Sequence, residues 1–169
     1  MSEHAFEKTG VPTPDMIRER FPSAERLKQG RVAVAECYQR IPCNPCQSAC
    51  PRKAIEVGED INNLPVVNSA LCTGCGICLS KCPGLAIMVV DCTVGGGMAE
   101  ISLPYEFLPL PQAGDMVTAL NRGGETLCEA KVVKVQNPPS FDRTPVVTLR
   151  VEEKYLYETR GFRRKEEEA

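Results

Sequence analysis

Apolar and polar residues alternate through positions 113–152, a pattern typical of β-strands with one buried face. It predicts strands at 115–120, 127–135 and 146–151, and the first two are joined by a tight turn at Asn121-Arg122-Gly123-Gly124. Several short strands of this kind favour a small all-β, barrel-like domain over residues 113–156.

Shorter elements are expected in the first half of the chain. Apolar runs at 32–35, 55–57 and 87–90 indicate strands, and residues 14–21 and 23–30 indicate two helical turns. Ser23 is the expected N-cap of the second turn and Gly30 its C-cap.

One cysteine run carries the strongest chemical signal in the chain. Cys72, Cys75, Cys78 and Cys82 are separated by two, two and three residues, and Pro83 follows the last cysteine. This spacing is typical of the thiolates that bind [4Fe–4S] clusters, in which the fourth cysteine reaches a neighbouring cluster.

A second copy of the run lies upstream. Cys43, Cys46 and Cys50 repeat the last three positions, and Pro51 again follows. The candidate for the missing first ligand is Cys37, in a loop three residues longer than its counterpart. Short helices are expected after each of the two Cys-Pro bends.

Two other uses of the cysteines were weighed. Structural zinc also takes four thiolates, but zinc ribbons do not need a third cysteine two residues on, nor the proline. Disulfides are disfavoured because the start of the chain has no apolar leader segment, so ten cysteines indicate metal ligands in a reducing, cytoplasmic compartment. Cys92 and Cys128 remain outside the motifs and are expected to be inert, buried thiols.

Over residues 37–92 the chain resembles the bacterial two-cluster ferredoxins. The resemblance implies two [4Fe–4S] clusters, each taking three thiolates from one motif and the fourth from the other. The implied ligands of cluster I are Cys37, Cys43, Cys46 and Cys82, and those of cluster II are Cys72, Cys75, Cys78 and Cys50. Without Cys37 as a ligand, cluster I would be a [3Fe–4S] centre or a cube with a labile iron.

The expected fold class is therefore α+β, with a two-cluster ferredoxin-like module followed by the barrel-like domain. An N-terminal extension with short helical turns covers residues 1–36, and the ferredoxin module covers 37–92. A Gly- and Pro-rich linker or docking arm follows at 93–112, and a charged tail at 157–169 comes after the barrel-like domain.

Composition and charge argue against three further classes of function: nucleic-acid binding, membrane spanning and catalysis. The formal net charge is −2 and the predicted barrel has no basic, aromatic face, so nucleic acid is not an expected partner. No apolar stretch is long enough to span a membrane. The chain has a single histidine, no paired carboxylates and no glycine-rich phosphate loop, so no catalytic site is expected.

The two clusters are not expected to be equivalent. Gly74 and Gly76 let backbone amides approach cluster II, whereas Pro42 and Asn44 stand at the aligned positions upstream. Pro42 and Pro45 remove two N–H donors from the upstream motif, which favours a lower reduction potential for cluster I.

Three functions fit these features. Two-thirds of the chain lies outside the ferredoxin module, which favours an electron-transfer subunit of a multi-subunit oxidoreductase over a free diffusible ferredoxin. A redox or oxygen sensor is the third alternative. Residues 22–50 and the 103–111 arm with its barrel resemble the small dicluster subunits of FAD-dependent amine and amino-acid dehydrogenases, of the proline, hydroxyproline and sarcosine type. That resemblance implies a flavoprotein dehydrogenase partner in a hetero-oligomer, with FAD or FMN on the partner only.

Overall fold

The computed structural model of the protein describes residues 3–165, so the outermost parts of the predicted N-terminal extension (1–2) and charged tail (166–169) lie outside it. No helix in the described range is long and apolar enough to cross a membrane. The helices are short: α1 (Glu3–Thr9), α2 (Pro14–Arg20), α3 (Ala24–Leu27), α4 (Pro45–Ala49) and α5 (Ile77–Lys81), with 3-10 turns η1 (Pro139–Phe141) and η2 (Glu153–Tyr155).

Side-chain caps define where two of these helices begin. The Thr13 and Ser23 hydroxyls accept hydrogen bonds from the backbone N–H groups of Met16 and Arg26, both at 3.3 Å. The predicted N-cap at Ser23 is therefore confirmed. The predicted C-cap at Gly30 is wrong, because α3 already ends at Lys28.

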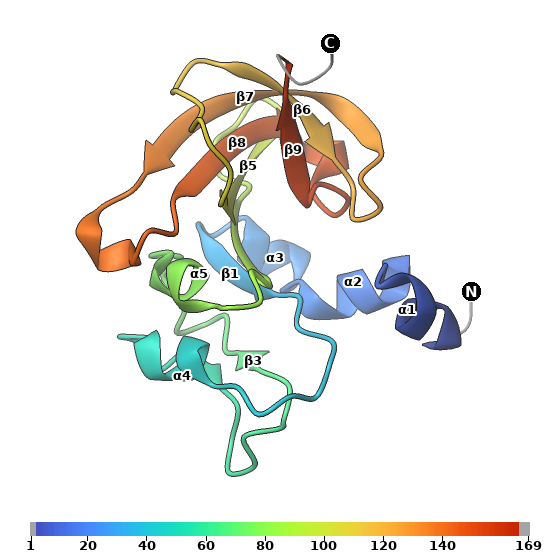
Figure 1. Cartoon of the computed structure of the whole chain (residues 1–169), viewed down its shortest axis with the longest axis vertical. Helices are drawn as coiled ribbons and strands as arrows, with labels where there is room; N and C mark the ends of the chain where they lie inside the picture. Colours follow the sequence, from blue (N-terminus) through green and yellow to red (C-terminus); the bar gives the residue numbers. More distant parts are fainter. Residues whose placement is uncertain (1–2, 166–169) are drawn as a thin grey trace.

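Seven strands form one antiparallel sheet in the spatial order β1-β4-β5-β8-β7-β6-β9 (Figure 1). In this view the cysteine-bearing helix α5 lies beside β1, and α4 lies lower, near β3 of the separate β2–β3 pair. The strands are β1 (Val32–Ala35), β2 (Ile55–Glu56), β3 (Val66–Val67), β4 (Ile87–Asp91), β5 (Met98–Pro104), β6 (Met116–Leu120), β7 (Thr126–Gln136), β8 (Val146–Glu152) and β9 (Gly161–Arg164).

The chain is mixed α and β as expected, but the predicted closed barrel is wrong. Within residues 3–165, β1 and β9 form the two open edges of the sheet and do not pair with each other. The predicted linker contributes β5, which pairs with β4 on one side and β8 on the other. The strands expected to close a barrel therefore continue the sheet that begins in the cysteine-bearing half.

Strand β1 is buried on both of its faces. Val32 and Val34 pack into a core that includes Ile17, Phe21 and Leu27 from the N-terminal extension. Ala33 and Ala35 belong to a second core, shared with Leu79 and two of the motif cysteines. Because adjacent residues of a strand point to opposite faces, this short apolar run joins the extension to the cysteine module.

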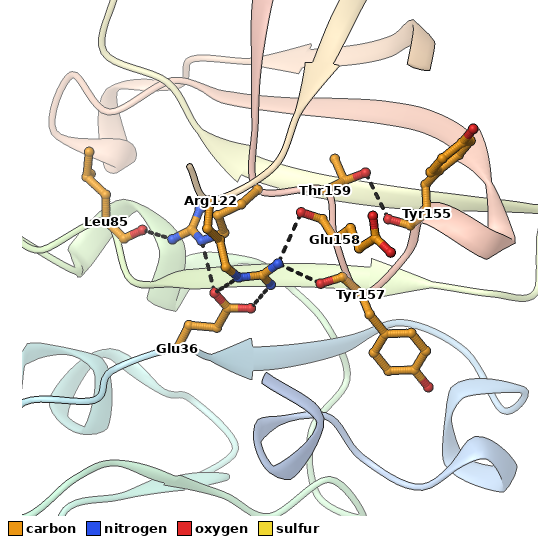
Figure 2. A network of polar contacts seen from close by, with 8 residues as sticks. Glu36, Leu85, Arg122, Tyr155, Tyr157, Glu158 and Thr159 are labelled. Atoms are coloured by element: carbon orange, nitrogen blue, oxygen red, sulfur yellow. Dashed lines mark hydrogen bonds and ion pairs between the residues drawn. The ribbon is translucent and has the colours of Figure 1, made fainter. Parts of the chain in front are cut away.

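A buried ion cluster connects the far end of the sheet to the same region. The Glu36 carboxylate, directly after β1, accepts hydrogen bonds from Nε (2.9 Å) and Nη2 of Arg122. Arg160 Nε lies 3.4 Å from the same carboxylate, and its Nη2 donates to the Leu85 carbonyl. Figure 2 shows the Glu36 carboxylate joined to the Arg122 guanidinium by dashed lines. The Glu36 side chain is 4 % exposed and that of Arg122 7 %, so their charges are screened little by water.

Arg122 also binds the backbone of the turn that precedes β9. Its Nη1 donates to the carbonyls of Tyr157 (2.6 Å) and Glu158 (3.0 Å), which Figure 2 shows together. The turn itself is closed by the Thr159 hydroxyl, which donates to the Tyr155 carbonyl at 2.9 Å. The β6–β7 hairpin, the turn before β9 and the end of β1 are thus held by one carboxylate and two arginines.

We expect Glu36→Gln to lower the free energy of unfolding by about 3–5 kcal/mol, because two buried guanidinium groups lose their counter-charge. The matched control is Glu100→Gln, which weakens the half-exposed pair between Glu100 and Arg150 on β5 and β8. That change should cost less than about 1 kcal/mol. Anaerobic urea unfolding followed by circular dichroism compares the two, and equal effects would contradict the role of the buried cluster.

Candidate iron–sulfur site

Two pairs of strands bring the two cysteine motifs together. The antiparallel pairing of β1 with β4 places Ala35 opposite Ile87, and the Glu36 N–H donates to the Ala86 carbonyl at 2.8 Å. Cys37 therefore leaves β1 beside the segment that follows Cys82. In the same way, β2 pairs with β3, and the Asn68 N–H donates to the Ala54 carbonyl at 2.8 Å, which joins the segment after Cys50 to the one before Cys72.

The third cysteine of each motif stands on a helix. Cys46 on α4 and Cys78 on α5 are buried, and the two helices pack against each other. These helices lie between the second and last cysteines of each motif. The expectation that they follow the Cys-Pro bends is therefore wrong, because Cys50 and Cys82 end the helices and a proline comes next.

The backbone after each last cysteine repeats closely. Lys53 and Leu85 have positive φ angles of 50° and 51°. The next residues, Ala54 and Ala86, donate their N–H groups to the Sγ atoms of Cys50 (3.2 Å) and Cys82 (3.3 Å). The aligned sequence repeat is thus also a repeat of conformation, and each copy directs an N–H donor to a cysteine sulfur.

All four cysteines implied for cluster II line one cavity. Cys50, Cys72, Cys75 and Cys78 surround it, together with small and apolar residues that include Ala33 and Ile55. Burial raises the pKa of the Cys78 thiol to about 12, and the nearby Cys72, Cys75 and Cys50 raise it further. Cys72 Sγ also accepts a hydrogen bond from the Ala33 N–H at 3.3 Å.

The cysteines implied for cluster I also lie close enough to influence one another. Burial raises the pKa of Cys37, and Cys82 and Cys43 add to the increase. The pKa of Cys46 is likewise raised by burial and then by Cys82 and Cys43. The structure therefore brings Cys37, Cys43, Cys46 and Cys82 into one neighbourhood.

These features fit a cationic cluster. Burial and the negative charge of neighbouring thiolates both raise the pKa values of these cysteines, so free thiolates are unfavourable here. Bound iron supplies the positive charge that favours deprotonation of the thiols. Among residues 3–165, no three His, Cys, Asp or Glu side chains are placed to hold a single metal ion. A [4Fe–4S] cube distributes its ligands over separate irons, so its thiolates do not meet at one point.

The structure adds one supporting residue, Arg26, that the sequence does not indicate, and a second role for Gly74. Arg26 on α3 donates to the carbonyls of Cys72 (2.8 Å) and Ser69 (2.7 Å), and also to those of Gly30 and Arg31. Gly74 (φ +62°) packs so closely on Arg31 that a Cβ there would lie 2.4 Å from the Arg31 Cβ. Gly74 is therefore needed for contact with the chain before β1, and not only for access to a cluster.

The two cysteines outside the motifs lie apart from both sets. Cys92 and Cys128 pack at the margin of the core that contains the N-terminal extension. Burial raises the pKa of both thiols, and neighbouring carboxylates, Glu153 and Asp91 for Cys92 and Glu152 for Cys128, add to the increase. A thiol with a raised pKa is a weak nucleophile at neutral pH.

The comparison with protein families decides between iron–sulfur and other uses of these cysteines. Residues 39–88 match the family described as the 4Fe-4S dicluster domain. The chain carries a ferredoxin-type iron–sulfur module. The match begins two residues after Cys37 and ends within β4, so it includes the other seven motif cysteines.

Curated relatives also match part of the chain. The ferredoxin-type protein NapF of Escherichia coli (strain K12) is 40% identical over 52 residues, which are 30% of this chain and 32% of NapF. An uncharacterized ferredoxin of Methanocaldococcus jannaschii is 37% identical over 75 residues, which are 40% of this chain and 43% of that ferredoxin. The chain thus spans about a third of the length of the NapF proteins that it matches. No solved structure matches the chain.

We expect Gly74→Ala to reduce the occupancy of cluster II, because the new Cβ collides with Arg31 and the backbone has a positive φ. Gly76→Ala is the matched control, since it also has a positive φ (+84°) but has no atom within 4 Å of the new Cβ. Iron analysis should fall from about eight to about four irons per chain in Gly74→Ala and much less in Gly76→Ala. Equal iron loss in both variants would attribute the effect to backbone strain alone.

We also expect cluster I to have the lower reduction potential. Two sulfurs of the cluster II set, on Cys50 and Cys72, accept backbone N–H bonds, whereas one sulfur of the cluster I set, on Cys82, does so among the described residues. Each N–H donor stabilises the reduced cluster. A redox titration followed by electron paramagnetic resonance measures both midpoints, and Ala33→Pro, which removes the donor to Cys72, should lower that of cluster II. Two equal midpoints would contradict this expectation.

Proposed function

We propose that this protein is an electron-transfer subunit of a larger, flavin-dependent oxidoreductase. Its two [4Fe–4S] clusters would be held by Cys37, Cys43, Cys46 and Cys82 and by Cys72, Cys75, Cys78 and Cys50. When bound, each cube carries one electron at a time. The main support is the crossing of the two cysteine motifs: the β1–β4 pair joins the segments next to Cys37 and Cys82, and the β2–β3 pair joins those next to Cys50 and Cys72.

The part of the chain outside the cysteine module supports a role within a complex. The arm that follows β5 exposes two large apolar side chains, Phe107 (70 % exposed) and Leu108 (83 %). Exposed apolar groups next to one another are typical of protein–protein contacts. This arm is the surface that we propose for docking to the flavoprotein subunit.

The protein residues around the clusters have defined tasks in this proposal. Backbone N–H groups of Ala33, Ala54 and Ala86 stabilise negative charge on the sulfurs. Arg26 fixes the loop that begins at Cys72 by binding its carbonyl oxygen. The partner would be a dehydrogenase of the amine or amino-acid class, which gives up two electrons per substrate that leave through the clusters one at a time.

The test is anaerobic affinity purification of the tagged protein from its own host. We expect a flavoprotein at stoichiometric amount, and we expect reduction of the clusters when an amine or amino-acid substrate is added, measured by paramagnetic resonance. Leu108→Glu should reduce recovery of the partner while iron content stays unchanged, because a charge on an exposed residue disturbs docking and not folding. The control is Met116→Glu, on another exposed apolar residue outside the arm.

Purification of the protein without a flavoprotein would contradict the proposed subunit role. A lone protein that carries about eight irons, with no flavoprotein attached, would establish a diffusible ferredoxin instead.

A further inference from the structure

A cavity of about 600 Å³ lies beside Cys37, between the N-terminal extension, the arm after β5 and strand β9. Its volume is within the range of small-molecule sites, about 300–1,000 Å³. Neither the cysteine ligation nor the docking arm accounts for it.

The walls of this cavity are aromatic. The Tyr105 ring stacks on Phe162, with centroids 4.6 Å apart and planes at 15°, and Phe107 meets Tyr105 edge-on at 5.6 Å. Phe6 and Tyr38 form a second edge-on pair at 5.4 Å. All five rings line the cavity. A lining with this many rings favours a flat ring that can stack on aromatic side chains.

One part of the lining is polar and carries positive charge. Glu36, Arg122 and Arg160 all line the cavity, and two guanidinium groups share one carboxylate. Arg160 uses Nη2 for a hydrogen bond to the Leu85 carbonyl and Nε for an ion pair with Glu36 at 3.4 Å, and its side chain is 20 % exposed. Its remaining amine, Nη1, has no partner among residues 3–165 and is available to an acceptor in the cavity.

A second polar group in the lining lacks a partner. The Tyr38 hydroxyl is buried and has no hydrogen-bond partner within the described part of the chain. Burying a hydroxyl without a partner is unfavourable, so such groups commonly mark a place where a ligand or water binds. The cavity thus combines flat aromatic walls with donors suited to carbonyl oxygens.

We propose that this cavity binds a planar conjugated ring bearing carbonyl oxygens, the chemistry shared by quinones and the isoalloxazine ring of flavins. The ring would stack on the aromatic side chains, and its carbonyl oxygens would accept hydrogen bonds from Arg160 and from the Tyr38 hydroxyl. Because Cys37 lines the same cavity, the ring would lie beside the implied first ligand of cluster I. Binding at this site goes beyond the proposed function and does not require a partner subunit.

Other ligand classes use less of the site. A purely aliphatic ligand leaves both donors unpaired. An inorganic anion makes no use of the five rings, and the neighbouring Glu36 carboxylate offsets part of the positive charge that would attract it. A planar ring with acceptor oxygens uses the walls and the donors together.

The test is a calorimetric titration of the iron-loaded, full-length protein in its oxidised form with three probes. Riboflavin represents flavins, duroquinone represents quinones and does not alkylate thiols, and adenosine is a planar ring without a carbonyl oxygen. We expect riboflavin or duroquinone to bind and adenosine to bind at least about tenfold more weakly. Binding of one redox ring and not the other identifies the source of the ligand.

Neighbouring residues of the arm provide a matched pair of variants. Phe107 lines the cavity and Leu108 does not, although both are exposed. Phe107→Ala should weaken the bound ring roughly tenfold, the equivalent of about 1.4 kcal/mol, and Leu108→Ala should leave affinity unchanged. Tyr38→Phe keeps the ring of Tyr38 and removes its hydroxyl, so we expect a weakening of about fivefold.

Three results would overturn the proposal. These are no binding of either redox ring at millimolar concentration, equal binding of adenosine, or affinity that is unaffected by Phe107→Ala and Tyr38→Phe. Iron analysis of the same samples keeps this test separate from the proposed function. Full iron content without ring binding rejects only the ring site, whereas ring binding without a flavoprotein partner in the host rejects only the subunit role.

Discussion

The buried carboxylate of Glu36 is the contact on which the arrangement of the whole chain depends. It follows β1 directly, precedes Cys37, and holds two arginines that come from the opposite end of the sheet. A carboxylate with almost no exposure to water is stable only when it is fully paired. Its pairing therefore requires the β6–β7 hairpin and the turn before β9 to be in place, and their position in turn determines where β1 ends.

The cysteines are placed by strand pairing rather than by their spacing alone. Spacing sets how far three thiolates of one motif can spread, but the fourth thiolate must arrive from elsewhere. The β1–β4 pair brings Cys37 to Cys82, and the β2–β3 pair brings Cys50 to Cys72. Both pairs consist of backbone hydrogen bonds, so the backbone itself determines which thiols become neighbours. Each of the two groups of thiols also has at least one N–H group pointing to a sulfur.

The sequence predicted the positions of most strands correctly, but it did not predict which strands pair with one another. Strands β1, β4, β6, β7 and β8 lie where alternation or apolar runs placed them, because a strand's period is a local property. The barrel was wrong because closure depends on which strands become neighbours. Residues 98–104 lie between glycines and prolines, a composition that indicates a linker, yet they supply the interior strand β5. Similarly, the charged stretch 161–164 pairs with β6 although its side chains indicated a solvated tail.

The residues that support the cysteine site show a second limit of prediction from sequence. Arg26 has no special sequence context, and its role depends on four carbonyl groups that meet only in the folded chain. Gly74 was assigned to the neighbourhood of a cluster, whereas the structure adds a contact with Arg31 that no pattern encodes.

These two contacts bear on how far the cysteine segment can be separated from its surroundings. A segment cut at residue 37 loses Arg26, Arg31 and β1 together, and with them the support for the loop at Cys72. The cysteine motifs alone are therefore not sufficient to build this site in another protein. In this chain, Arg26, Arg31 and β1 lie before the first motif cysteine and yet determine the shape of the loop that carries the second cysteine set.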